Sequence, residues 1–472
     1  YYTLLDISPG SYNFNFLDGV IIGIKPNDGS TILDDQTWSG VVHLNRKTIL
    51  LDHSTLTLLP GTTVISSFGS SLQISGILNA NGVAGDSIRF TAADPQLRWD
   101  GLTVEQGNWD ETDSTNMDYS VVELSRYGGL KLNNLKKFQM NHSSVRNNKE
   151  YPYIAYDGSY WCSAYNCCAS SCSGGGIFAT ASDGRIINSR ISGNWAWGSG
   201  GGISVYGPNN MLYVDNCLID HNETRLNGGG CYLNAGAKVR IRGNEFKANS
   251  ATEGGAIALY NISVDSLSEA PLIFGNHIWN NGGAFSAGIF SGNSDAMIVN
   301  NVISENSCFG MGDNVLSISG SGANTKVWLV NNTIVCNSGS NAHIGISGDV
   351  GFSPRFYNTI IADNSSQGCI GGGALVRIET SGIKPVFHHC YISKDSLSFS
   401  GSPGASYFSD TAFFKNNLSY IDLRLSSVGD WKPNFNSPCI DEGNSIDFLA
   451  WLDPTDIAGN PRMNRKIDIG AW

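Results

Sequence analysis

Long apolar runs are missing from this chain of 472 residues. No stretch reaches the roughly 18 apolar residues that a membrane-spanning helix needs, and no signal peptide is visible. We therefore do not expect a transmembrane protein. Because the chain opens on Tyr1 and Tyr2, we expect a mature protein or an excised fragment.

Positive charge is also scarce. The chain has 29 Lys and Arg against 41 Asp and Glu, so its formal net charge is −12. Nucleic-acid binding depends on clustered Lys and Arg. The composition therefore argues against nucleic acid and against an anionic membrane surface as partners.

Known motifs for phosphate and calcium are absent as well. The glycine triplets that start at Gly174, Gly200 and Gly228 lack the GxxxxGK[ST] pattern and a βαβ setting, so we interpret them as bend residues. The calcium-binding nonapeptide needs Asp after GGxG, where these segments carry other residues. We expect no cofactor and no metal site; calcium stays open, without a motif to support it.

The chain does contain a recurring seven-residue motif. Each copy ends in Asn and carries a branched apolar residue or Phe three places earlier. The last residues are Asn148, Asn194, Asn222, Asn249, Asn281, Asn306, Asn337, Asn364 and, as a variant, Asp395; the apolar residues are Val145, Ile191, Ile219, Phe246, Ile278, Ile303, Ile334, Ile361 and Ile392. From Asn194 on the spacings are about 25–32 residues, with short alternating strands between them, which is typical of a solenoid; the insertion explains the longer step from Asn148 to Asn194.

Consecutive coils travel the same way round, so their strands must pair in parallel, and parallel connections are right-handed in nearly all cases. The sequence therefore predicts an all-β, right-handed parallel β-helix. The apolar series should form one internal stack, and the Asn series should form a ladder of amides that bond the coils above and below.

Two segments resemble known proteins. Residues 38–104, with "STLTLLPGTTV", "LQISGILNANGVAGDSIRFTA" and "WDGLTV", resemble the first coils of secreted bacterial right-handed parallel β-helix proteins of the pectate-lyase-like superfamily. The end, "SPCIDEGNSIDFLAWLDPTDIAGNPRMNRKIDIGAW", resembles the closing motif that often precedes a C-terminal sorting or anchoring domain, as in type IX secretion. The family pattern continues with an aromatic residue and Glu, whereas this chain stops at Trp472. The resemblance implies a secreted, cell-surface protein that uses secretion or anchoring machinery through a missing C-terminal domain.

Three regions are expected along the chain. Residues 1–37 are interpreted as an N-terminal cap or linker, residues 38–430 as the β-helix with an insertion at 149–173, and residues 431–472 as a C-terminal capping motif. The terminal Asp441, Asp456, Arg462 and Asp468 are interpreted as a salt-bridged cap rather than a metal or catalytic set.

The eleven cysteines fall into two groups. Scattered cysteines that lie within predicted strands, such as Cys217, Cys231 and Cys390, are expected to be small core residues. Four crowd into the insertion, at Cys162, Cys167, Cys168 and Cys172. This cluster is the expected disulfide site, with its pairing left open; its spacing fits zinc poorly.

The insertion is the predicted ligand site, because solenoid insertions often emerge on the binding face. Aromatic faces beside carboxylates suit sugar rings, which present apolar C–H faces and hydroxyl rims. The alternative is that these aromatics only pack the insertion onto the coils. The predicted substrate-binding residues are Tyr156, Asp157, Tyr160, Trp161, Trp195 and Trp197.

No catalytic motif is evident, and catalytic residues stay unknown. If the chain is an enzyme, the fold favours a polysaccharide lyase, which would use a Lys or Arg base, or a glycoside hydrolase, which would use paired carboxylates. The charged candidates near the insertion are Arg146, Lys149, Asp183, Arg185, Arg190, Asp215, Asp220, Glu223 and Arg225. Two functions remain open: a secreted or cell-surface protein that binds polysaccharide, with or without processing it, or a non-catalytic adhesin or structural cargo protein.

Overall fold

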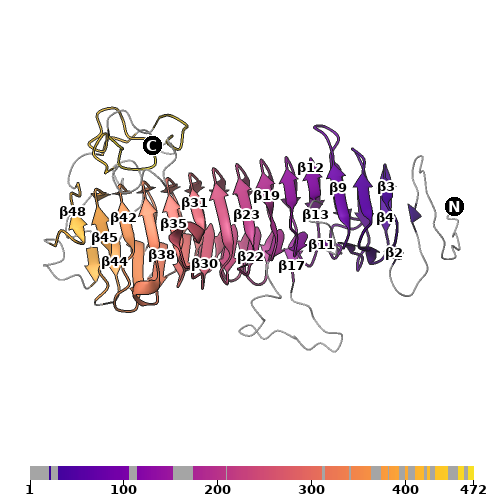
Figure 1. Ribbon diagram of the computed structural model, residues 1–472, viewed down its shortest axis with the longest axis horizontal. Coiled ribbons are helices and arrows are strands. Elements are labelled where there is room, and N and C mark those ends of the chain that lie inside the picture. Colours follow the sequence, from indigo (N-terminus) through magenta and orange to yellow (C-terminus); the bar gives the residue numbers. More distant parts are fainter. Residues whose placement is uncertain are drawn as a thin grey trace. The chain divides into compact units, whose positions relative to one another are not determined.

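The computed structural model of the chain (Figure 1) describes residues 21–22, 30–105, 114–151, 174–208, 210–310, 314–339, 342–362, 374–380, 382–392, 399–401, 410–418, 423–425, 431–444, 455–461 and 466–472. The chain divides into two compact units, unit 1 (Tyr1–Arg225) and unit 2 (Leu226–Trp472). Within the described residues, the helical elements are two short 3-10 turns, η1 (Leu267–Glu269) and η2 (Gly322–Asn324). Both units are otherwise built from short strands.

Unit 1 consists of three long parallel sheets and a short fourth one. Sheet A1 contains β1 (Ile21–Ile22), β4 (Val41–Leu44), β7 (Thr63–Ser66), β10 (Ile88–Ala92), β13 (Ser120–Glu123), β16 (Ser144–Arg146), β20 (Arg190–Ser192) and β24 (Leu218–Asp220). Sheet B1 contains β2 (Ser30–Ile32), β5 (Thr48–Leu50), β8 (Leu72–Ile74), β11 (Leu102–Glu105), β14 (Leu130–Asn133), β18 (Ile177–Thr180) and β22 (Ile203–Tyr206). Sheet C1 contains β3 (Gln36–Trp38), β6 (Thr55–Leu58), β9 (Ile77–Asn81), β12 (Thr115–Asp118), β15 (Phe138–Asn141), β19 (Asp183–Ile187) and β23 (Met211–Asp215); sheet D1 contains β17 (Lys149–Glu150), β21 (Trp195–Ala196) and β25 (Glu223–Thr224).

Unit 2 repeats this plan. Sheet A2 contains β28 (Glu245–Lys247), β32 (His277–Trp279), β36 (Val302–Ser304), β40 (Thr333–Val335), β43 (Ile360–Ala362) and β46 (Tyr391–Ile392). Sheet B2 contains β26 (Cys231–Asn234), β30 (Ile257–Tyr260), β34 (Ser286–Gly292), β38 (Asn314–Gly320), β41 (Ala342–Gly348), β44 (Ala374–Ile378) and β47 (Phe399–Gly401). Sheet C2 contains β27 (Lys238–Arg242), β31 (Leu272–Phe274), β35 (Ala296–Val299), β39 (Val327–Val330), β42 (Arg355–Tyr357), β45 (Val386–His388) and β48 (Phe414–Lys415); sheet D2 contains β29 (Ser250–Ala251), β33 (Gly282–Gly283) and β37 (Ser307–Cys308).

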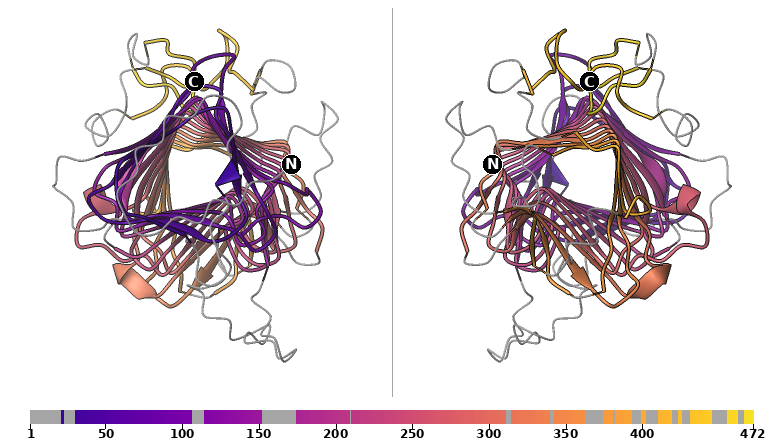
Figure 2. Two further views of the ribbon diagram at one scale, coloured as in Figure 1. Left: turned by 90° about the vertical axis from the view of Figure 1, so that its right-hand side faces the viewer. Right: turned by 90° about the vertical axis from the view of Figure 1, so that its left-hand side faces the viewer.

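In each unit one turn of the chain adds one strand to each long sheet, and the three sheets form the sides of the coil (Figure 2). Side chains alternate in and out along a strand, and the inward ones stack from coil to coil. Val145, Ile191 and Ile219 are paired in register on sheet A1 and are fully buried. The predicted apolar stack is therefore confirmed here, and on sheet A2 it continues from Phe246 to Ile392.

The predicted amide ladder is also confirmed. In unit 1 the Asn194 Nδ2 donates to Oδ1 of Asn222 at 2.9 Å, and Asn148 Nδ2 donates to Oδ1 of Asn194 at 3.0 Å. In unit 2 Asn249, Asn281, Asn306 and Asn337 are linked in the same way. Asn364 and Asp395 lie outside the described residues.

A second ladder runs five residues before the first in each coil, and the sequence analysis missed it. In unit 1 Ser120, Ser143 and Ser189 form it: the Ser120 N–H donates to Ser143 Oγ at 2.9 Å, and the Ser143 N–H to Ser189 Oγ at 3.1 Å. In unit 2 its members are Asn244, Asn276, Asn301 and Asn332. Each coil therefore has two corners that are fixed by buried polar groups.

The glycine triplets precede strands rather than open them. Strands β18 and β22 begin at Ile177 and Ile203, so the triplets lie in the turns that lead into these strands. Gly174 and Gly200 have φ values of 84° and 74°, which favour glycine and do not occur in a strand. Their interpretation as bend residues is confirmed.

The scattered cysteines Cys217, Cys231 and Cys390 are free and buried, as predicted. Burial raises the pKa of each of these thiols to about 12. The four clustered cysteines, Cys162, Cys167, Cys168 and Cys172, lie outside the described residues.

The closing segment lies against the outer face of sheet A2. Leu423, Trp431, Cys439, Ile469 and Ala471 pack with outward-facing side chains of that sheet in one buried cluster. Backbone contacts fix the segment there, since the Gly470 N–H donates to the Asn358 carbonyl at 2.8 Å.

The proposed boundaries at residues 37 and 430 stay predictions. Near the first of them, strands β2 and β3 already pair in parallel with β5 and β6.

Candidate functional site

Four of the predicted sugar-binding residues, Tyr156, Asp157, Tyr160 and Trp161, lie outside the described residues. The other two, Trp195 and Trp197, are described and come from one coil of unit 1. They lie beside Tyr151, at the point where the chain leaves sheet D1. We call Tyr151, Trp195 and Trp197 the aromatic strip.

Sheet D1 turns the aromatic strip outward. Lys149, Trp195 and Glu223 are paired in register on consecutive strands, and so are Glu150, Ala196 and Thr224. The second set is buried, so the alternation of a strand directs the first set outward. Tyr151 remains 40% exposed, and both tryptophans are half-buried.

The rings of the aromatic strip contact one another. The ring centroids of Tyr151 and Trp195 are 5.4 Å apart, and those of Trp195 and Trp197 are 6.2 Å apart with nearly perpendicular planes. Cations flank the strip: Arg225 lies 4.1 Å over the Trp197 ring, and the Lys149 ammonium is 5.7 Å from the Tyr151 ring. The rings are therefore held in place before any ligand arrives.

A buried carboxylate fixes the backbone of the strip. The Trp197 N–H donates to the Glu150 carbonyl at 3.0 Å and lies 3.2 Å from Glu150 Oε2. Glu150 is only 5% exposed. Glu150 supports the backbone of the aromatic strip from beneath the surface, and we assign it a structural role.

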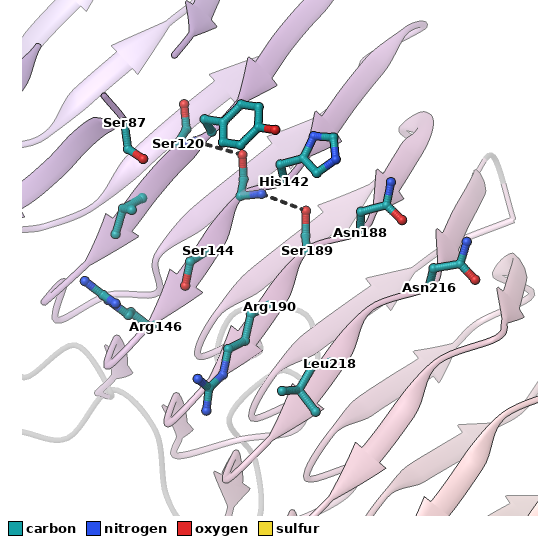
Figure 3. A pocket seen from close by; sticks show the side chains of 13 residues that line it. Ser87, Ser120, His142, Ser144, Arg146, Asn188, Ser189, Arg190, Asn216 and Leu218 are labelled. Atoms are coloured by element: carbon teal, nitrogen blue, oxygen red, sulfur yellow. Dashed lines mark hydrogen bonds between the residues drawn. The ribbon is translucent and has the colours of Figure 1, made fainter. Parts of the chain in front are cut away.

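A polar groove of about 440 Å³ lies on the outer face of sheet A1 in the same unit (Figure 3). Its lining side chains come from the turns before β10, β13, β16, β20 and β24 and from the strands themselves. They are Ser87, Tyr119, Ser120, Val121, His142, Ser143, Ser144, Arg146, Asn188, Ser189, Arg190, Asn216 and Leu218. Arg146 and Arg190 were among the charged candidates in the sequence, but the groove itself was not foreseen.

One rim of the groove is formed by turn residues with a left-handed backbone. Tyr119, His142, Asn188 and Asn216 all have positive φ, between 42° and 53°. Asn tolerates this conformation, whereas bulky residues adopt it rarely and at a cost. His142 stacks on Tyr119 with centroids 4.7 Å apart, and its Nδ1 lies 3.2 Å from Oδ1 of Asp118. The same positive φ occurs at bulky residues of other turns, such as Leu124 and His221, so the conformation belongs to the coil corners, and the stacked His142–Tyr119 pair is what distinguishes this rim.

The opposite rim carries two arginines, each held by a buried carboxylate. Arg146 Nε donates to Glu123 at 2.8 Å, and Arg89 Nε donates to the same carboxylate at 2.5 Å. Burial alone would raise the pKa of Glu123, but the bonds and charges of Arg146 and Arg89 outweigh burial and lower it. Glu123 is therefore ionised at neutral pH.

The second carboxylate is Asp220. Arg190 binds it in a bidentate manner at 2.9 and 2.7 Å, and the His221 Nδ1 lies 2.7 Å away. Burial raises the pKa of Asp220, but Arg190 and His221 lower it by more. In return, the hydrogen bond to Asp220 raises the pKa of Arg190, which makes this guanidinium a poor general base.

Glu123 and Asp220 are too far apart for glycoside hydrolysis. Glu123 pairs in register with Arg146, Arg146 with Ser192, and Ser192 with Asp220. Three steps of about 4.8 Å separate their backbones by about 14 Å, whereas paired catalytic carboxylates lie about 5–9.5 Å apart. The two carboxylates orient arginines and do not form a hydrolase pair.

The remaining charged candidates lie elsewhere. Asp183, Arg185 and Asp215 belong to sheet C1, where Asp183 accepts from the Met211 N–H at 2.7 Å and Arg185 lies 4.8 Å from the Tyr213 ring centroid.

In unit 2 the carboxylates of the closing segment bind backbone groups. The Asp441 N–H donates to Asp468 at 2.7 Å, and Asp456 accepts from the Asn460 N–H at 2.8 Å. Arg462 lies outside the described residues. Among the described residues, no group of His, Cys, Asp and Glu could hold a metal ion.

One comparison with known proteins, the family model, supports the fold. The family model for the right handed beta helix region matches residues 107–265 and, overlapping them, 153–339. The class of protein is thus a right-handed parallel β-helix, an all-β solenoid.

Among solved structures, the chain is similar to the crystal structure of Dettilon tailspike protein. The TM-score is 0.28 and the identity 11%, over 79% of this chain and 60% of that one. The chain thus spans less than two thirds of that tailspike's length, and the likeness carries no argument about a ligand. No curated protein matches this sequence. Within the described residues, no helix is long and apolar enough to cross a membrane.

Proposed function

We propose that this chain is a polysaccharide-binding β-helix of the cell exterior, and that the aromatic strip of unit 1 is its main contact with the sugar chain. The observation that carries the proposal is the outward cluster of Tyr151, Trp195 and Trp197, whose rings contact one another while remaining partly open to solvent. Sugar rings present apolar C–H faces that pack on such rings.

The geometry favours an extended ligand. Tyr151 and Trp195 lie on neighbouring coils of sheet D1, because Lys149 pairs in register with Trp195, whereas Trp197 follows Trp195 on the same coil. Arg225 covers one face of Trp197, which leaves the Trp195 and Tyr151 rings as the principal stacking surfaces. A linear polysaccharide that lies along the stack would contact them in succession.

We propose binding without cleavage at this surface. Glu150 is buried and contacts the backbone, while Glu123 and Asp220 are ion-paired and about 14 Å apart. Arg190, the candidate lyase base, has a raised pKa. This arrangement supports an adhesin-like role over a lyase or a hydrolase.

Substituting the strip tests the proposal. Trp195→Ala should weaken binding of a polysaccharide, found by screening neutral and acidic glycans, by at least tenfold, because the ring is the central contact of the strip. Trp279→Ala is a matched control: Trp279 is also a half-buried strand tryptophan with a cation, Lys247, 4.1 Å over its ring. Equal losses in the two variants, or no glycan bound by the wild-type chain, would contradict the proposal.

The absence of cleavage and the location need separate tests. Bound polysaccharides should yield neither new reducing ends nor unsaturated products on long incubation; either product would favour an enzyme.

Location outside the cell is supported by the resemblance of residues 38–104 and of the closing segment to secreted β-helices. Antibody detection of the protein on intact cells of its source would test it, and detection only after lysis would count against it.

A further inference from the structure

We infer that the polar groove on sheet A1 is a second subsite that selects an anionic sugar residue, one carrying a carboxylate or a sulfate. This inference rests on the proposed polysaccharide binding and names the class of polysaccharide. It is carried by the free donors of Arg146 and Arg190 and by the absence of Asp and Glu from the groove lining.

Arg146 is only partly used by the protein. Its Nε binds Glu123, and within the described part of the chain its two terminal nitrogens have no partner. Its side chain is 43% exposed. A guanidinium that is anchored through Nε presents both terminal nitrogens as a fork, which matches the oxygens of a carboxylate or sulfate.

Arg190 supports the same ligand from the next strand. It binds Asp220 through Nε and one terminal nitrogen, so its other terminal nitrogen remains available, and its side chain is 55% exposed. Figure 3 shows both guanidinium groups on the side of the groove away from His142. Because buried carboxylates hold both arginines from behind, little side-chain entropy remains to be lost on binding.

Local charge favours an anion despite the chain's net charge of −12. The two sets of ion pairs at this rim contain Arg89, Arg146 and Arg190 with Glu123 and Asp220, which leaves one net positive charge, while Asp118 lies at the opposite rim against His142. At physiological salt the screening length is about 8 Å, so a bound anion responds mainly to this rim. The hydroxyls of Ser87 and Ser144 and the amides of Asn188 and Asn216 supply neutral hydrogen bonds for sugar hydroxyls.

The groove and the aromatic strip are close along the chain. In one coil Arg146 precedes Lys149 by three residues, and in the next Ser192 precedes Trp195 by three, with the buried amide ladder at the corner between them. One polysaccharide can therefore place an acidic residue in the groove and the rest of the chain on the strip.

A matched pair of variants at Leu218 tests the inference. Leu218 lines the groove and pairs in register with Arg190. Leu218→Glu places a carboxylate where that of the ligand would lie, whereas Leu218→Gln has the same shape without the charge. Ser144→Asp and Ser144→Asn form a second pair from β16, in case one position affects folding; circular dichroism checks that each variant is folded.

Calorimetry would compare three sets of oligosaccharides of equal length: uronate-containing, sulfated and neutral. We expect the wild-type chain to prefer one of the anionic sets, Leu218→Glu to weaken that binding at least tenfold, and Leu218→Gln to retain it within about twofold. Binding of neutral oligosaccharides, which depends on Trp195, should be the same in both variants. Equal effects of Glu and Gln at both positions, or no preference for anionic chains, would overturn the inference.

Two further results show whether the anionic subsite alone or the proposed function as a whole is wrong. If the wild-type chain binds neutral oligosaccharides but shows no anionic preference, the subsite is wrong and the proposed function stands; if no oligosaccharide binds, both fail. Free sulfate or acetate that competes as strongly as the oligosaccharide would show a simple anion site and would also overturn the assignment to a sugar.

Discussion

Glu123 illustrates how single residues make this surface. Its side chain is 4% exposed and binds two arginines from neighbouring coils, Arg89 and Arg146. A buried carboxylate is costly unless it is paired and hydrogen-bonded, and here the pairing also orients Arg146 toward the groove. The same contact thus serves stability and the proposed recognition of an anion.

The pH dependence of stability should reveal this pairing. Because the pKa of Glu123 is lowered in the folded chain, its stabilisation is present above the pKa of the unfolded state and is lost as the pH falls through the lower, folded value. Glu123→Gln should therefore lower the free energy of unfolding by about 3 kcal/mol at pH 7, and this difference should shrink below about pH 4.5.

Urea unfolding of both chains between pH 3 and 7 measures the effect. Glu269→Gln is a suitable control, because Glu269 is half exposed and its pair with Lys238 is at the surface; it should cost less than about 1 kcal/mol at any pH. A Glu123→Gln deficit that stays constant down to pH 3 would show that the pKa of Glu123 is the same in the folded and unfolded chains, and that the arginines do not lower it.

At the scale of strands and turns, the recurring seven-residue motif predicted one inward stack and one corner of the coils that carry it. The seven-residue spacing placed Val145, Ile191 and Ile219 inside and Asn148, Asn194 and Asn222 at one corner, because period and residue type are sufficient for a stack. The second ladder could also have been predicted from the sequence, because Ser143, Ser189 and Asn244 each stand five residues before an Asn of the first ladder. Its residue type differs between the units, with Ser in unit 1 and Asn in unit 2, so the two halves do not read as one recurring residue.

The groove could not be predicted in the same way. Its rim residues Tyr119, His142, Asn188 and Asn216 are spread over nearly a hundred positions and meet only because successive coils stack in register. One signal was available: each precedes a member of the second ladder, a place with positive φ that suits Asn or Gly. This signal is not specific to the groove, because bulky residues such as Leu124 and His221 have positive φ at other turns.

The closing segment makes a prediction at the scale of an element. Trp431 is fully buried in the cluster that covers sheet A2, whereas Phe435, four residues later, is 94% exposed. Trp431→Ala should destabilise unit 2 by about 3–5 kcal/mol, while Phe435→Ala should have little effect. Thermal unfolding followed by calorimetry compares them, and equal melting temperatures of wild-type and Trp431→Ala would show that the segment does not cover the sheet in solution.

At the scale of the whole chain, the solenoid limits how far a local change can spread. Each coil contacts mainly its neighbours, so stability is close to a sum of coil terms and nearest-neighbour terms. Asn194 is a sensitive place to test this, since its side chain joins three coils: it accepts from Asn148 and donates to Asn222 and to the Val145 carbonyl. Its removal leaves buried donors and acceptors without partners, which costs about 3 kcal/mol.

Hydrogen exchange with mass spectrometry should therefore show a local effect of Asn194→Ala. Exchange should rise in the strands of the coils that Asn194 joins, β16, β20 and β24, and should stay unchanged in unit 2, for example at β36 and β40. Gln139→Ala, an exposed site on β15, is the control and should change exchange nowhere. If Asn194→Ala instead raises exchange evenly along the chain, the coils unfold as one cooperative body, and the additive description of the solenoid is wrong.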